Sequence, residues 1–334
     1  MRKVINLVDV GYTRIRKNLR ARRNLSFRQR EIEAHYASKY AVPNRLYVEC
    51  TNVCNARCVF CYYPKIADTH PRRYMDVESF RRILMEFKRG GGVEVGLTPT
   101  VGDPFIDPHF PERIRVLNDV GIDTFLYTNL IHVSAKIERA LRSVSGFRFT
   151  VNASVAGFDR EAYARLMGVD RFEDMKRNLP RVRDIARGNP NFKLAVRLQD
   201  YYGSDASKKA FVEFLDSLDI PYSVNTLVDT WGGLVEQEID RVGELEKRPR
   251  LARIGPCRIS YLKPLVTVDL KLKLCDCRDV KNELIVGDLA SQSLQEAWSG
   301  DEAKRIRASM YDPQHMPEIC SKCEMYVSIF DHKE

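Results

Sequence analysis

The sequence predicts an α/β fold in which helices cover the outside of a parallel sheet. Short apolar runs typical of strands alternate with helical stretches from residue 45 onward. Repeated alternation of this kind favours strand–helix–strand units, whose strands run parallel. With 334 residues, of which 44% are hydrophobic and 30% charged, the chain is long enough for one large domain and a smaller companion.

The predicted strands are short apolar runs, and helices separate them. They span residues 45–50, 93–98, 122–127, 148–154, 192–198 and 221–226. The clearest helices span 77–88, with Asp76 as the expected N-cap, and 108–120, which ends at Gly121. Where such parallel strands curl into a barrel, the chemistry is found at their C-terminal ends.

The first 44 residues are predicted to form a basic leader. Residues 1–30 contain ten Lys or Arg and one acidic residue, which accounts for the whole formal charge of +9. Apolar residues recur there every three or four positions from Ile5 to Leu19, as in an amphipathic helix. We favour a helical extension packed on the body with a solvated basic face. The alternative is a segment that binds an anionic membrane surface or an acidic partner.

The remaining composition excludes several classes of protein. Residues 31–334 are electrically neutral, which argues against an extended nucleic-acid groove. No run of about 18 apolar residues occurs, and the N-terminus lacks an apolar signal-peptide core, so neither a membrane span nor secretion is expected. Nine cysteines without a secretory context indicate a reducing compartment, where clustered thiols bind metal. The expected location is cytoplasmic, with peripheral membrane contact through the leader as the open alternative.

A C-x3-C-x2-C motif formed by Cys54, Cys58 and Cys61 follows the first predicted strand. Iron–sulfur cubanes normally take four thiolates, so three on one loop suit a cluster with one iron left for another ligand. A structural zinc site is the alternative. Zinc sites usually pair two Cys knuckles and close with a fourth ligand, which an asymmetric triple fits poorly.

This motif, with Phe60 directly before its last cysteine, resembles the signature of the radical S-adenosylmethionine (SAM) enzymes. The resemblance implies that Cys54, Cys58 and Cys61 ligate a 4Fe-4S cluster whose fourth iron is chelated by SAM, with Phe60 near the adenine. It also implies reductive cleavage of SAM to a 5′-deoxyadenosyl radical that abstracts hydrogen from a substrate. A partial (β/α)6 barrel and an electron donor such as flavodoxin or ferredoxin are further implications.

A turn after the second predicted strand extends this resemblance. Gly102, Asp103 and Pro104 resemble the G-G-E-P stretch of the family, which implies contact with the SAM amino group. Val101 stands in place of the first glycine, and Asp103 in place of the glutamate. Considered without the cysteine motif, this Gly-Asp-Pro would be an ordinary turn.

Three polar residues near later strand ends are further candidates for SAM binding. Ser154 resembles the serine of the S-x-D-G stretch, although Ala156 replaces its aspartate. Arg197 lies within the fifth strand, where a guanidinium needs an anionic partner, either the SAM carboxylate or a structural salt bridge. Asn129 is a family-like candidate whose alternative is a helix cap.

A charged linker is expected near residues 236–255, and the C-terminal part that follows, from residue 257 onward, contains five of the nine cysteines. In order, it contains Cys257, a predicted hairpin over 262–274, Cys275, Cys277, a Gly-Asp-Leu stretch, a helical stretch from Leu294 that includes Trp298, and the C-x2-C pair Cys320 and Cys323. By count, four thiols suit a closed cubane and a zinc site equally.

This order resembles the SPASM, or shorter twitch, auxiliary-cluster domain of radical SAM enzymes. The resemblance implies a second 4Fe-4S cluster held by Cys257, Cys275, Cys320 and Cys323. The expected domains are therefore the leader at 1–44, the partial barrel at 45–250, and an auxiliary-cluster domain of hairpin and helix at 251–334.

Two cysteines remain after seven are assigned to clusters: Cys50 and either Cys275 or Cys277, since the sequence leaves open which of these two ligates the auxiliary cluster. Cys50 is expected to be a small buried hydrophobe. Cys277 is a candidate catalytic residue, because epimerases of this superfamily need a thiol that donates a hydrogen atom. The alternative, which we favour, is a non-catalytic or alternative ligand, since adjacency in sequence does not show that a thiol faces substrate.

The resulting hypothesis is a radical SAM enzyme acting on a small polar metabolite, such as a sugar, an aminocyclitol or a nucleoside-linked sugar. The auxiliary cluster would accept an electron and so assist oxidation, and the ligand order is similar to that of the aminocyclitol dehydrogenases. One alternative is a peptide-modifying maturase, although the residues before the first strand are too few for its usual recognition domain. Others are an epimerase that uses Cys277 and a nucleic-acid- or membrane-binding iron–sulfur protein.

Overall fold

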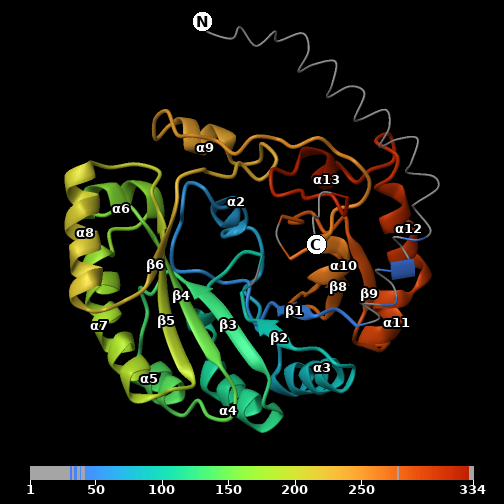
Figure 1. Ribbon diagram of the computed structural model, residues 1–334, viewed down its shortest axis with the longest axis horizontal. Coiled ribbons are helices and arrows are strands. Elements are labelled where there is room, and N and C mark those ends of the chain that lie inside the picture. Colours follow the sequence, from blue (N-terminus) through green and yellow to red (C-terminus); the bar gives the residue numbers. More distant parts are fainter. Residues whose placement is uncertain are drawn as a thin grey trace, which may run out of the picture.

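The computed structural model describes residues 42–98, 100–276 and 278–330, together with positions 31, 34, 35 and 38. Its described part is organised by one nine-stranded sheet in the order β6-β5-β4-β3-β2-β1-β7-β8-β9 (Figure 1). Strands β1 to β6 are all paired in parallel. The predicted α/β class is therefore confirmed.

The six parallel strands coincide with the predicted apolar runs to within two residues at each end. They are β1 (Arg45–Val48), β2 (Glu94–Gly96), β3 (Asp123–Thr128), β4 (Phe149–Ala156), β5 (Phe192–Gln199) and β6 (Tyr222–Asn225). Fully buried and partly exposed residues alternate along β5 and most of β4. Since successive side chains point to opposite faces, one face packs under the helices and the other lines a partly open interior.

Helices cover the outer face of these strands (Figure 1). They are α3 (Val77–Arg89), α4 (Phe110–Val120), α5 (Ala135–Arg142), α6 (Arg160–Met167), α7 (Phe172–Gly188) and α8 (Asp205–Ser217). The predicted cap of α3 is confirmed, because the Asp76 side chain accepts a hydrogen bond from Ser79 N at 2.7 Å. The predicted end of α4 is also confirmed, because Gly121 adopts the left-handed conformation with φ 65°.

The C-terminal elements extend the same sheet beyond β1. Strand β7 (Leu265–Val266) pairs in parallel with β1, and β8 (Lys271–Lys273) and β9 (Ile285–Asp288) follow in antiparallel order. This confirms the predicted hairpin and adds β9, which the sequence did not identify as a strand. The helices of this C-terminal part are α10 (Ile259–Leu262), α11 (Leu294–Ser299), α12 (Asp301–Ser309) and α13 (Glu318–Lys322).

The predicted leader helix and the predicted linker are described separately from these elements. The leader helix over residues 1–30 lies outside the described residues. The charged stretch 236–255, expected as a linker, contains α9 (Glu236–Asp240) and a bridge that pairs Val228 with Lys247. The proposed domain boundaries remain a prediction. No helix among the described residues is long and apolar enough to cross a membrane.

Candidate functional site

The cysteine loop follows β1 and is anchored to the end of α6. Arg57 N donates to Met167 O at 2.9 Å, and Val59 N donates to Leu166 O at 3.0 Å. Gly168 follows α6 with φ 67°, and a Cβ atom at this position would lie 2.2 Å from Arg57 O. A glycine is needed here because it tolerates positive φ and leaves room for the loop backbone.

The three thiols of this loop interact electrostatically. Burial raises the pKa of Cys58, and the neighbouring Cys61 and Cys54 raise it further. Backbone N–H groups point at two of the sulfur atoms, with Ala56 N 3.4 Å from Cys54 Sγ and Tyr63 N 3.5 Å from Cys61 Sγ. Hydrogen bonds of this kind stabilise cluster-bound thiolates and tune cluster potentials.

The donor set therefore fits an iron–sulfur cluster. Within the described residues no three His, Cys, Asp or Glu side chains already form a metal-binding group. The backbone brings the three cysteines onto one loop, and thiolates are the ligands that iron–sulfur clusters take. Cys50, in contrast, is 2% exposed, which agrees with its prediction as a small buried hydrophobe, and burial raises its pKa to about 12.

The predicted turn Gly102-Asp103-Pro104 fastens the cysteine loop to the sheet. Asp103 N donates to Val53 O at 2.8 Å, in the segment directly before the first cysteine. Gly102 has φ 130°, and Pro104 begins the 3-10 helix Pro104–Ile106. The turn is thus placed beside the cysteine loop, where the resemblance predicts the SAM amino group.

The carboxylate of Asp103 is directed at protein donors. It accepts hydrogen bonds from Thr128 Oγ1 at 2.9 Å, from Asn129 N at 2.8 Å and from Phe105 N at 2.9 Å. Burial raises its pKa, and these hydrogen bonds act in the opposite direction. The side chain joins the end of β3 to the turn after β2, and its predicted contact with SAM stays a prediction.

Asn129 connects the end of β3 to the cysteine loop. Its Nδ2 donates to Asn55 Oδ1 at 2.7 Å and contacts Cys54 Sγ at 3.7 Å, while its Oδ1 accepts from Ile131 N at 2.9 Å. The helix-cap alternative is wrong, because α5 is capped by Ser134. A direct contact between this side chain and SAM remains a prediction.

Ser154 and Arg197 are direct neighbours on the inner face of the sheet. They are register partners in the parallel pair of β4 and β5, and both side chains are partly exposed to the barrel interior. The structural salt bridge considered for Arg197 is absent, since this guanidinium has no carboxylate partner among the described residues. Its other predicted role, pairing with the SAM carboxylate, stays a prediction.

A hydrogen-bonded network near these residues was not predicted. Tyr201 Oη donates to Gln199 Oε1 at 2.7 Å, and Asn225 Nδ2 lies 2.8 Å from Gln199 Oε1 and 2.7 Å from Tyr201 Oη. Arg248 donates to Asn225 Oδ1 at 2.9 Å. The ring of Tyr201 also packs edge-on against Phe60, with 5.3 Å between centroids. Arg248 lies in the stretch expected to be a linker, so no local signal identified it.

The loop at residues 229–233, after β6, joins the cysteine loop to the C-terminal region. Trp231 Nε1 donates to Phe60 O at 2.9 Å. Arg278 lies over the Trp231 ring at 4.3 Å and forms an ion pair with Asp229 at 2.7 Å. The carboxylate of Glu324, directly after Cys323, accepts hydrogen bonds from the Thr230 backbone and hydroxyl. Figure 1 correspondingly shows α2 (Tyr63–Ile66) between the barrel strands and the C-terminal elements.

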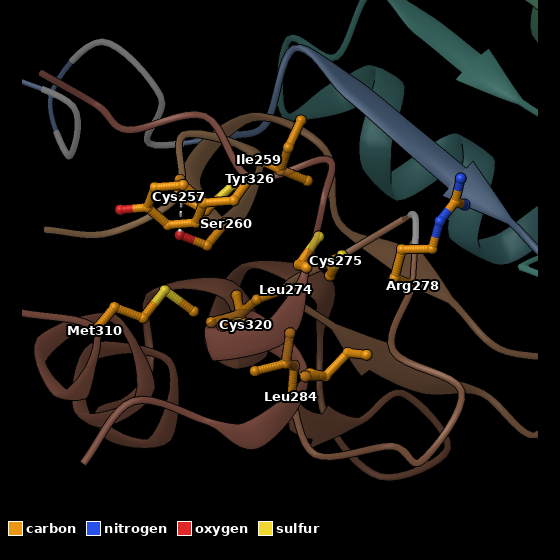
Figure 2. A pocket seen from close by; sticks show the side chains of 12 residues that line it. Cys257, Ile259, Ser260, Leu274, Cys275, Arg278, Leu284, Met310, Cys320 and Tyr326 are labelled. Carbon is orange, nitrogen blue, oxygen red and sulfur yellow. Dashed lines mark hydrogen bonds between the residues drawn. The ribbon is translucent and has the colours of Figure 1, made fainter. Parts of the chain in front are cut away.

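The four predicted auxiliary ligands line one cavity. Figure 2 shows Cys257, Cys275 and Cys320 grouped around it, with Arg278 at its edge and directed away from the thiols. Cys323 also lines the cavity, and most of the other lining residues are apolar. Four thiols in a largely apolar cavity form a donor set that fits an iron–sulfur cluster.

Burial governs the titration of these auxiliary thiols. It raises the pKa of Cys257 to about 11 and that of Cys323 to about 12. The pKa of Cys320 is also raised by burial and further by the neighbouring Cys275 and Cys257. The N–H group of Met325 lies 3.3 Å from Cys323 Sγ and stabilises the thiolate form.

The catalytic candidate Cys277 lies outside the described residues. Its role as a hydrogen-atom donor and its role as an alternative ligand therefore both stay predictions.

The fold and the cysteine loop together define a radical SAM enzyme. The chain belongs to the Radical SAM superfamily, whose family model matches residues 48–192, and residues 256–324 match SPASM, the iron–sulfur cluster-binding domain. It accordingly binds SAM and an iron–sulfur cluster in the barrel and an auxiliary iron–sulfur cluster in the C-terminal domain. These matches confirm the family, the partial-barrel fold and the class of enzyme.

Solved structures show the same fold at low sequence identity. Streptococcus suis SuiB bound to S-adenosylmethionine has a TM-score of 0.63 and 16% identity, and the match covers 89% of this chain and 76% of that chain. BtrN in complex with AdoMet and 2-DOIA has a TM-score of 0.52 and 14% identity, with 84% of this chain and 93% of that chain covered.

A curated relative matches a shorter region. The GTP 3′,8-cyclase of Chlorobaculum tepidum is 30% identical over 135 residues, which is 40% of this chain and 38% of that protein. This chain therefore spans about two fifths of the length of that relative.

Proposed function

We propose that this enzyme abstracts hydrogen from a small polar metabolite and that its auxiliary cluster assists the oxidation. The observation that carries the proposal is the polar inner face of β5 and β6. Gln199, Tyr201 and Asn225 present amide and phenol groups beside Phe60, in the interior where a substrate would meet SAM. Such groups orient hydroxyl-rich substrates by hydrogen bonds.

The proposed cofactors are two 4Fe-4S clusters and SAM. Cys54, Cys58 and Cys61 would hold the first cluster, and the four thiols of the C-terminal cavity the second. When bound, these groups supply one-electron chemistry that protein side chains lack. The chain's own residues fix the cysteine loop through Gly168 and Asp103 and leave a partly enclosed space for the substrate.

A second candidate is peptide modification. It is supported by the fold similarity to SuiB, one of whose structures contains the precursor peptide SuiA. The open edge of the sheet, where Tyr222 and Val224 of β6 are 40% and 46% exposed, would give a longer substrate room to leave the interior.

The partners are also proposals. An electron donor such as flavodoxin or ferredoxin would reduce the first cluster, and residues 1–30 would contact an anionic membrane surface or an acidic partner. We place the enzyme in the cytoplasm because its clustered thiols need a reducing compartment.

The substrate class can be tested by stimulation of SAM cleavage. The reconstituted enzyme is incubated anaerobically with SAM, dithionite and a sugar, an aminocyclitol, a nucleoside-linked sugar or a peptide. We expect one metabolite class to raise the rate of 5′-deoxyadenosine formation and Asn225→Ala to reduce that stimulation. The control is Asn118→Ala, which removes a half-buried amide that donates to Ser143 O and accepts from Ser145 N, and it should keep the native response. Stimulation by the peptide alone would contradict the metabolite proposal in favour of the second candidate.

A further inference from the structure

Three guanidinium groups from separate parts of the chain act through their charges on the phenol of Tyr201. Arg197 comes from β5, Arg248 from the stretch after α9, and Arg278 from the C-terminal region. Burial raises the pKa of the Tyr201 phenol, while all three guanidiniums lower it through their charges. Geometry joins one of them to Tyr201, because the Asn225 amide donates to Tyr201 Oη at 2.7 Å and accepts from Arg248 at 2.9 Å.

Two of these guanidiniums have no acidic partner in the part of the chain that the structure describes. Asp229, whose charge also acts on the Tyr201 phenol, is paired with Arg278 at 2.7 Å. Within the described residues, Arg197 and Arg248 have no carboxylate partner. A half-buried guanidinium without an anion is costly, because desolvation is then offset only by neutral hydrogen bonds.

Arg248 is held in place by a neutral amide. Its Nη2 donates to Asn225 Oδ1 at 2.9 Å, and the same amide is fixed on its nitrogen side by Gln199 and Tyr201. An amide accepts one of the five N–H groups of a guanidinium and leaves the others for a ligand. This arrangement orients Arg248 before a ligand arrives.

This site also contacts the residue that is predicted to lie beside the adenine of SAM. The Tyr201 ring contacts Phe60, the residue predicted beside the adenine, at 5.3 Å. Arg278 lies on Trp231, which is bonded to the backbone of Phe60. The proposed site therefore lies next to the residue that is predicted to meet the adenine of SAM.

We propose that Arg248, next to Tyr201, binds an anionic group of the substrate, a phosphate or a carboxylate. Guanidinium groups are suited to this role because their planar fork matches both anions. The inference rests on the proposed function and narrows it. Among the proposed metabolites it favours a nucleoside-linked sugar, whose linkage carries phosphate, over a neutral sugar or a cationic aminocyclitol.

The test is calorimetric titration of the anaerobic, SAM-loaded holoenzyme in buffer free of phosphate and carboxylate. The probes are glycerol 3-phosphate, glycerate and glycerol, which share one backbone and differ in charge. We expect at least one anionic probe to bind at least tenfold more tightly than glycerol, and the probe that binds identifies the group. Arg248→Gln should weaken that binding at least tenfold, because a charge-assisted hydrogen bond is lost.

The matched control is Arg183→Gln, which changes a half-buried arginine of α7 that donates to Leu218 O at 3.1 Å and forms an ion pair with Asp219. It should bind the probes as the native enzyme does. Anionic probes that bind no more tightly than glycerol, or that bind Arg248→Gln unchanged, would overturn the inference. SAM cleavage, measured on the same native sample, distinguishes failure of the anion site from failure of the proposed function. A sample that cleaves SAM without preferring anions contradicts only the anion site, whereas one that never cleaves SAM contradicts the proposed function itself.

Discussion

The contact between Trp231 and Phe60 should set how tightly the enzyme holds SAM. Trp231→Phe keeps an aromatic ring but removes the N–H group that donates to Phe60 O at 2.9 Å. Leaving that half-buried carbonyl without its donor costs about 1–3 kcal/mol. A weaker stack with Arg278, now 4.3 Å from the ring, costs about 0.5–1 kcal/mol more. In the variant, part of the free energy of SAM binding would be used to order this loop. The Kd for SAM should therefore rise about tenfold or more.

The assay is equilibrium dialysis of SAM against the anaerobic, reconstituted protein. Tyr62→Phe is the control, because the Tyr62 ring stacks on Trp231 with 6.4 Å between centroids and loses only a hydroxyl. It should bind SAM as the native protein does. A Trp231→Phe protein with native iron content and native SAM affinity would refute the reasoning that this loop orders the SAM site.

Two further predictions concern other parts of the fold. Gly168→Ala should weaken SAM binding, because its Cβ would meet Arg57 O at 2.2 Å in addition to the strain of φ 67°. Gly146→Ala is the control with φ 76° and nothing within 4 Å, so it should show a strain cost of about 1–2 kcal/mol without loss of SAM binding. Burial raises the pKa of Glu49 from 4.5 to about 6, so its neutral form stabilises the fold below pH 4.5 and that contribution is lost as the pH rises through 6. Glu49→Gln should therefore remove about 2 kcal/mol of pH dependence between pH 4 and 7 in denaturant titrations, because the native protein loses that stability as the pH rises.

The elements that the sequence predicted correctly are those with local signals. Apolar runs marked the six parallel strands, and Asp76 and Gly121 marked helix ends through their own backbone preferences. The spacing of Cys54, Cys58 and Cys61 was sufficient to indicate the chemistry, because cluster ligands must be close together. The C-terminal thiols left zinc and iron–sulfur equally possible by count, and the SPASM match resolved that choice.

The features that escaped prediction depend on contacts between distant segments. Arg248 was assigned to a linker because its partner Asn225 becomes a neighbour only when the chain folds. The same holds for Trp231, whose donor reaches a backbone carbonyl 171 positions earlier. The helix-cap interpretation of Asn129 failed because a sequence does not show that a side chain points back to an earlier loop.

Iron content combined with SAM cleavage tests the central claim most directly. The native protein and a triple variant with alanine at Cys54, Cys58 and Cys61 are reconstituted without oxygen, and Cys50→Ala serves as the control thiol. The account predicts about eight irons per chain in the native protein and in the control, and about four in the triple variant. 5′-Deoxyadenosine should form in the native protein and the control alone. Equal iron content in the triple variant and the native protein, or SAM cleavage by the triple variant, would contradict the assignment of these cysteines to the radical-generating site.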